Sequence, residues 1–105
     1  MLILLYNKVR KVLCEREKLH IENDFALEKC WEQLIEILSI SEEETINCLE
    51  ACHKYEILWI SEVFEEVAYN LQSQKYIDCL KRLDKKYPEL NITRSVEVAQ
   101  SYILG

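Results

Sequence analysis

The stretch Glu56–Ser73, EILWISEVFEEVAYNLQS, decides how the rest of the chain is organised. Its apolar residues recur at steps of three and four, the spacing that predicts a helix with one broad apolar face. They are Leu58, Trp59, Ile60, Val63, Phe64, Val67, Ala68 and Leu71. The remaining arc is almost purely acidic, with Glu62, Glu65 and Glu66 preceded by Glu56. We therefore expect one central helix that supplies a core on one side and a negative surface on the other.

A scarcity of turn-forming residues predicts an all-α fold. The 105-residue chain has one glycine, Gly105, and one proline, Pro88. A β-sandwich or an α/β fold needs such residues roughly every ten positions. Half of the residues are apolar, which excludes a disordered chain and can supply a core without disulfides. We expect residues 1–105 to form a single domain, a compact bundle of about five to six helices.

Helical periodicity continues on both sides of the central stretch. We expect further helices over Met1–Lys18, over Phe25–Ile40, from Ser41 to about Lys54, over Ser73–Tyr87, and beyond Thr93. Pro88 should end the helix before it, because a residue that precedes proline avoids the α conformation. Capping residues are expected at three helix starts: Asn23 or Asp24, Ser41 with Glu44, and Thr93.

Apolar neighbours surround the five cysteines, which are Cys14, Cys30, Cys48, Cys52 and Cys79. Their odd number and scattered positions favour small buried hydrophobic residues in a reducing compartment over a disulfide framework. No secretory signal is visible, and no run approaches the roughly 20 apolar residues of a membrane span. We expect a soluble, cytoplasmic protein without membrane contact.

Catalytic and metal-binding patterns are weak in this sequence. Cys48, Cys52 and His53 resemble half of a metal site, but no second ligand pair completes it, so buried helical cysteines are the favoured interpretation. Cys52 and His53 do not form a nucleophile–base pair, because adjacent helical residues point about 100° apart. A chain whose only glycine is terminal cannot form a glycine-rich phosphate loop. We expect no enzyme activity, no metal and no cofactor.

Charge is strongly segregated along the chain. Between Glu22 and Glu66 there are thirteen acidic residues and two lysines, whereas both flanking segments are mildly basic. Such a negative middle disfavours nucleic acid as a direct ligand and favours a basic protein partner. Candidate partner-binding residues are Glu28, Glu32, Glu36, Glu62, Glu65, Glu66 and Tyr69. An ordinary solvated surface is the competing interpretation, although glutamates at four-residue steps, as in α-helical Glu28, Glu32 and Glu36, repel one another.

The second half of the chain resembles small all-helical immunity proteins of bacterial contact-dependent and other polymorphic toxin systems. The resemblance is carried by WISEVFEEVA (59–68), YIDCLKRL (76–83), and KYPEL (86–90) with EVA (97–99). It implies a non-catalytic inhibitor that binds a cognate toxin domain, in many such systems a nuclease with a basic cleft. An acidic inhibitor would be steered electrostatically to such a cleft.

Two other functions remain open from the sequence. A helical adaptor or self-associating regulatory subunit could use the apolar face of Glu56–Ser73 as half of a homodimer interface. A small metal or redox sensor could use Cys48, Cys52 and His53.

Overall fold

A computed structural model describes residues 2–18 and 24–104 of the chain. The α-helices are α1 (Leu2–Lys18), α2 (Asp24–Leu38), α3 (Glu42–Ala51), α4 (Lys54–Ile60), α5 (Phe64–Leu71), α6 (Gln74–Lys86) and α7 (Thr93–Ser101). Short 3₁₀ helices, η1 (Ser61–Val63) and η2 (Pro88–Leu90), complete the elements. Because α4, η1 and α5 follow without a loop, the described residues form six helical segments and no strand. The predicted all-α fold is confirmed. In these same ranges, no helix is both long enough and apolar enough to span a membrane.

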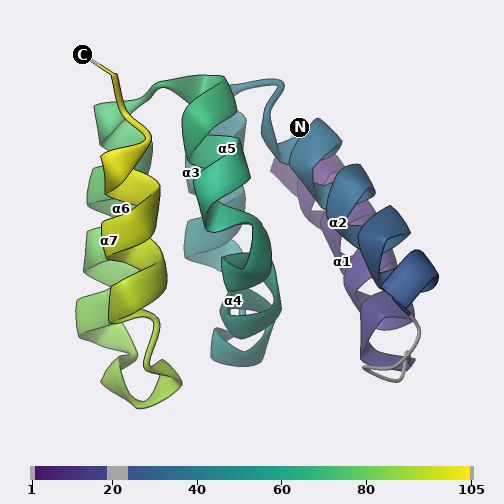
Figure 1. Ribbon diagram of the computed structural model, residues 1–105. Coiled ribbons are helices and arrows are strands. Elements are labelled where there is room, and N and C mark those ends of the chain that lie inside the picture. Colours follow the sequence, from purple (N-terminus) through teal and green to yellow (C-terminus); the bar gives the residue numbers. More distant parts are fainter. Residues whose placement is uncertain (1, 19–23, 105) are drawn as a thin grey trace.

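The helices form two layers of three segments (Figure 1). One layer contains α2, α4 with η1 and α5, and α7, and lies in front in the figure; the other contains α1, α3 and α6. Extensive contacts join α5 to α7 within the front layer, and α1 to α3 and α3 to α6 within the other. Contacts of α1 with α2 and of α6 with α7 close the two ends.

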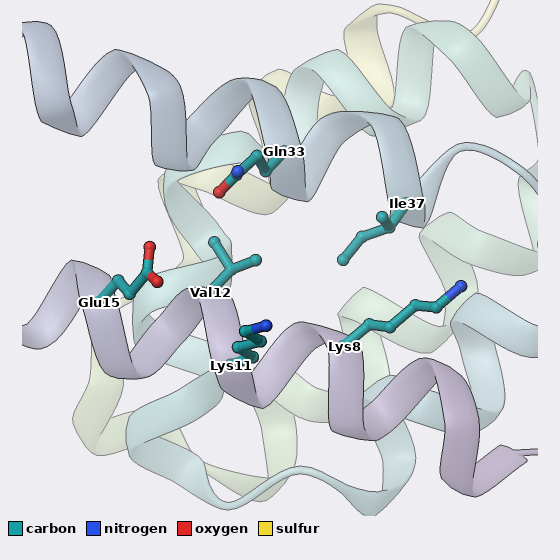
Figure 2. A pocket seen from close by; sticks show the side chains of 6 residues that line it. All are labelled: Lys8, Lys11, Val12, Glu15, Gln33 and Ile37. Carbon is teal, nitrogen blue, oxygen red and sulfur yellow. The ribbon is translucent and has the colours of Figure 1, made fainter.

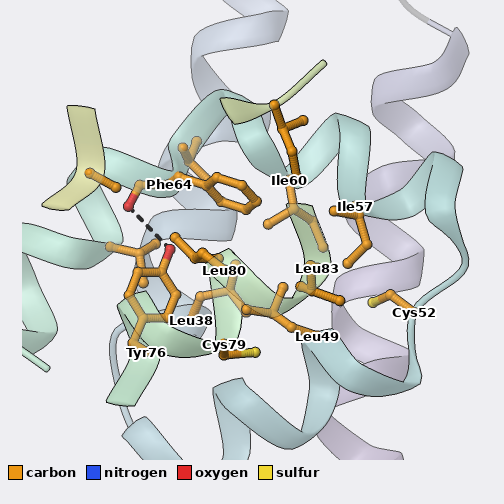
Figure 3. Packing of buried hydrophobic residues seen from close by; sticks show 14 of the residues in the cluster. Leu38, Leu49, Cys52, Ile57, Ile60, Phe64, Tyr76, Cys79, Leu80 and Leu83 are labelled. Atoms are coloured by element: carbon orange, nitrogen blue, oxygen red, sulfur yellow. Dashed lines mark hydrogen bonds between the residues drawn. The ribbon is translucent and has the colours of Figure 1, made fainter. Parts of the chain in front are cut away.

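The core lies between the two layers and draws on all the helices. Its largest fully buried side chains are Tyr76, Phe64, Leu34, Leu38, Leu49, Ile57, Ile60, Ile77, Leu80, Ile92, Val9 and Val63. Figure 3 shows how Phe64, Leu80 and Leu83 pack together with residues of α3 and α4. The apolar face of the central stretch is therefore used in the protein's own core.

The central stretch is two helices rather than one, so the expectation of a single helix over Glu56–Ser73 was wrong. The α-helix ends at Ile60, and η1 winds more tightly before α5 begins at Phe64. Val63 leaves the helical backbone region with φ −122° and ψ 13°. This break keeps both Val63 and Phe64 buried while the Glu62 side chain reaches across to α1. Leu58, expected in the apolar face, is instead 37% exposed.

One of the predicted helix caps is confirmed and one is corrected. Ser41 accepts a hydrogen bond from the Glu44 backbone N–H at 3.3 Å, and Ser73 caps α6 in the same way. Thr93 is not a cap but the first residue of α7, and its hydroxyl donates to the carboxylate of Asp84. Asn23 and the side chain of Asp24 lie outside the described part of the chain.

Four of the five cysteines are buried as expected, and Cys14 is not. Cys30, Cys48, Cys52 and Cys79 pack in the interior. Cys14 is exposed, because it follows the buried Leu13 on α1 and points about 100° away from it around the helix.

Tyr76 combines core packing with one buried hydrogen bond. Its ring is 1% exposed, and its hydroxyl donates to the Phe64 carbonyl oxygen at 3.1 Å, joining α6 to the start of α5 (Figure 3). Burial raises the pKa of Tyr76 well above its ordinary value.

Replacing Tyr76 by phenylalanine should lower the free energy of unfolding by about 1 kcal/mol, the usual net contribution of one buried hydrogen bond. Urea denaturation measures the effect: the midpoint for Tyr76→Phe should fall, while the slope of the free energy of unfolding against urea concentration stays the same. Tyr55→Phe, at a tyrosine that is 65% exposed, is the matched control and should unfold like the wild type. Equal stability of all three proteins would show that the bond contributes nothing.

Candidate protein-binding surface

Charge is distributed unequally between the two layers. We call one side of the protein the acidic layer. It consists of α2, α4, η1, α5 and α7, which together carry nine acidic residues and three basic ones. We call the other side the mixed layer. It consists of α1, α3 and α6, which together carry eight acidic and ten basic residues. The acidic middle of the sequence is therefore divided: the glutamates of α3 lie between two basic helices, while those of α2 and α5 lie on the opposite side.

All seven candidate partner-binding residues belong to the acidic layer. Glu28, Glu32 and Glu36 are exposed along α2, and Glu66 and Tyr69 are exposed on α5. The remaining two, Glu62 and Glu65, belong to η1 and α5. Among the residues that the structure describes, the glutamates other than Glu62 in this set form no salt bridge.

Glu62 differs from the others because its charge is neutralised within the chain. Its carboxylate accepts hydrogen bonds from Arg16 Nε at 2.9 Å, from Arg16 Nη2 at 2.7 Å and from Trp31 Nε1 at 3.0 Å. The Arg16 side chain is only 9% exposed, and its guanidinium carbon lies 4.4 Å from the centre of the Trp59 ring. We call these four residues the Arg16 cluster. It joins α1, α2, α4 and η1, so Glu62 has a structural role.

Glu56 is also held by α1. Its carboxylate accepts a hydrogen bond from the Tyr6 hydroxyl at 3.1 Å, and its other oxygen lies 3.4 Å from Arg10 Nε. It also accepts from the His53 backbone N–H at 2.8 Å, at the start of α4. Of the four glutamates in the central stretch, only Glu65 and Glu66 therefore remain without a cationic partner in the described structure.

Glu65 and Glu66 line a groove on the acidic layer, with a volume of about 410 Å³. Its walls come from α2, from α5 and from the residue that follows α7, and consist of Ile35, Glu65, Glu66, Tyr69, Asn70 and Tyr102; we call it the Tyr69 groove. Tyr69 and Tyr102 are 56% and 41% exposed. Their ring centres are 6.4 Å apart and the ring planes are perpendicular, at 89°. The groove therefore combines two carboxylates with two accessible aromatic rings.

Hydrogen bonds between helices hold the walls of the Tyr69 groove in place. Gln72 Nε2 donates to the backbone oxygens of Tyr69 and Tyr102, at 2.9 and 2.8 Å, and Gln72 Oε1 accepts from the Leu104 N–H. Gln72 occupies the left-handed region at φ 47°, which ends α5 and turns the side chain toward the last residues. On the opposite wall, Asn70 Nδ2 donates to Ser39 Oγ at 3.0 Å.

Glu66 carries its negative charge at a cost. Partial burial raises the pKa of Glu66 above its ordinary value, and the adjacent Glu65 carboxylate raises it further, against an opposing backbone hydrogen bond. Both causes mean that the groove disfavours an ionised Glu66 in the absence of a cation. A positive group placed in the groove would relieve this.

Sequence reasoning identified three of the residues in the Tyr69 groove and missed the others. Helical periodicity beyond Thr93 places Tyr102 on the last helix with Val98 and Ala99, but α7 ends at Ser101 and Tyr102 is 41% exposed. Ile35 belongs to the apolar positions of α2, and it is half-buried. Nothing in the sequence marks Gln72 as the residue that links Tyr69 to Tyr102.

A second groove, of about 260 Å³, lies between α1 and α2 and has a different character. Figure 2 shows Lys8, Lys11 and Glu15 of α1 on one side, with Gln33 and Ile37 of α2 on the other. Charges of both signs line it, so it does not select for a cation or an anion.

The cysteines give no support to a metal site. In the part of the chain that the structure describes, no three histidine, cysteine, aspartate or glutamate side chains are grouped to hold a metal ion. Cys48 and Cys52 hydrogen-bond to each other inside the core, which lowers the pKa of Cys48 and raises that of Cys52, whereas His53 is exposed.

Comparison of the chain with protein-family models, with curated proteins and with solved structures finds no match.

Proposed function

We propose that the protein is an immunity protein, which binds and neutralises a cognate bacterial toxin domain inside the cell. The acidic layer is its binding surface, and the Tyr69 groove is the centre of that surface. The toxin domain presents a basic cleft, as a nuclease does to hold the phosphates of its substrate. Inhibition is non-catalytic and results from occupying the surface that the toxin needs.

The uncompensated charge of the acidic layer is the observation that carries this proposal. Glu28, Glu32 and Glu36 repel one another at four-residue spacing, and desolvation together with the neighbouring Glu65 raises the pKa of Glu66. Glu65 and Glu66 favour the N-terminus of α5, but the glutamates of α2 stabilise nothing in the described structure by a salt bridge, whereas association with a basic protein gains both speed and specificity from all of them. Exposed tyrosine in the same groove provides the rigid, amphipathic contact that binding hot spots favour.

Self-association through the central stretch is less well supported. The apolar face of Glu56–Ser73 was the reason to consider it, and that face is buried in the core of the single chain at Val63, Phe64 and Val67.

A protection experiment tests the proposal. The toxin domain encoded beside this protein should arrest growth when expressed alone, and co-expression of this protein should restore growth. The two purified proteins should co-elute as one complex, and binding should weaken as salt rises because exposed charges are screened. Absence of both the complex and protection would refute the proposed function.

A further inference from the structure

We infer that the Tyr69 groove binds one arginine side chain of the protein partner, held by the carboxylates of Glu65 and Glu66 against the rings of Tyr69 and Tyr102. The inference deepens the proposed function and rests on it, because it specifies the group that the partner inserts into this site.

The charge of the groove favours a cation. Glu65 and Glu66 are the charged residues in its lining, and the other four lining residues are neutral. Neither carboxylate has a salt bridge within the described structure. The groove between α1 and α2, which contains Lys8 and Lys11, lacks this property and provides an internal comparison.

The aromatic rings favour arginine over lysine. A guanidinium is planar, so it can lie over a tyrosine face and at the same time donate two parallel hydrogen bonds to a carboxylate. Lysine can also lie over a ring, as Lys54 does over Tyr55 at 5.4 Å, but its compact, strongly hydrated ammonium cannot stack face to face or donate two parallel hydrogen bonds to one carboxylate. The tyrosines contribute exposed rings, and their perpendicular arrangement presents one ring face beside the edge of the other. Contact of a cation with such a ring is worth about 0.5–1 kcal/mol at an exposed site.

The protein already holds one of its own arginines with the same combination of groups. In the Arg16 cluster, the guanidinium of Arg16 donates two hydrogen bonds to the Glu62 carboxylate and lies over the Trp59 ring. The Tyr69 groove presents a carboxylate pair and a tyrosine pair without an arginine. The similarity is one of chemistry and not of sequence, since the two sites use different helices.

Gln72 is the positioning residue of the groove. Its side chain is hydrogen-bonded to the backbone oxygens of Tyr69 and Tyr102, so it holds together the two backbone segments that carry the rings. Asn70 does the same for the wall formed by α2, through Ser39. A site ordered in advance loses less conformational entropy when it binds.

Titration of the isotope-labelled protein with N-acetyl-arginine methylamide, followed by NMR, tests the inference. We expect saturable shifts at Glu65, Glu66, Tyr69 and Tyr102, with a dissociation constant of about 1 mM, as suits a single side chain. N-acetyl-lysine methylamide should bind at least roughly threefold more weakly, because it cannot stack or bind in a bidentate manner. Equal binding of the two probes, or shifts without saturation in this groove, would overturn the inference.

Two variants sharpen the test. Glu65→Gln with Glu66→Gln keeps the shape of the groove, and it should abolish saturation by the arginine probe. Gln72→Asn keeps a residue that tolerates the left-handed backbone, but its shorter side chain cannot reach both carbonyl oxygens. It should reduce the preference for arginine over lysine while thermal stability stays close to wild type. An unchanged preference would show that Gln72 has no positioning role.

The experiment separates the two proposals. If the toxin domain binds but the arginine probe does not, the arginine inference fails and the immunity function stands. If the probe saturates the groove but no toxin is neutralised, the immunity function fails and the specificity of the groove stands.

Discussion

Reversing the charge of Glu62 is expected to lower the free energy of unfolding by roughly 1.5 to 3 kcal/mol, because the nearly buried guanidinium of Arg16 loses its charged hydrogen-bond acceptor. Glu62→Lys would leave the guanidinium of Arg16, which is 9% exposed, facing a second cation. It would also remove the acceptor of the Trp31 indole N–H. Urea denaturation followed by circular dichroism measures the effect, and for a small domain this loss is a large share of total stability.

Glu65→Lys, three residues away on the same stretch, is the matched control, because Glu65 has no salt bridge in the described structure. Its stability should change by less than about 0.5 kcal/mol, as for other surface substitutions. A double variant, Arg16→Met with Glu62→Leu, should recover part of the loss, because it removes both charges together and leaves neither one unpaired. If Glu62→Lys were as stable as Glu65→Lys, the Arg16 cluster would have no structural role.

The sequence predicts those features of the fold that depend on local pattern. Helical periodicity predicts the all-α fold and places α1, α2, α3 and α6 to within a few residues. It also predicts buried positions such as Leu34, Val67 and Ile77. The Ser41 cap and the end of α6 before Pro88 follow from local backbone chemistry.

The features that the sequence does not predict depend on contacts between distant residues. The break at η1 accompanies the contact of Glu62 with Arg16, which lies 46 positions earlier in the chain. Periodicity within Glu56–Ser73 cannot indicate that a surface glutamate will be drawn toward another helix. The same reason explains why Glu62 was grouped with Glu65 and Glu66 as a partner-binding residue.

Charge counting along the chain was informative about sign but not about position. Glu42, Glu43, Glu44 and Glu50 belong to the acidic middle of the sequence, yet α3 places them between the basic helices α1 and α6. Only the packing of α3 into the mixed layer separates these glutamates from the ones on α2 and α5. The candidate surface is therefore narrower than the acidic segment that suggested it.

Reversing both charges in the Tyr69 groove should weaken binding of the toxin domain by about 100-fold or more. Close charge pairs across a protein interface contribute about 1.5 kcal/mol or more each, and about 1.4 kcal/mol corresponds to tenfold in affinity. Glu65→Lys with Glu66→Lys would also repel a basic partner before contact, so association should slow as well. Surface-based kinetic binding measurements at two salt concentrations would separate the two effects.

The matched control makes the same change of net charge on the other side of the protein. Glu43→Lys with Glu50→Lys alters two exposed glutamates of α3 in the mixed layer. If the groove is the centre of the interface, this control should slow association slightly and leave the dissociation rate unchanged, because its charges never meet the partner at close range. Equal loss of affinity in both double variants would mean that the partner responds to net charge alone, and the Tyr69 groove would then have no special role in recognition.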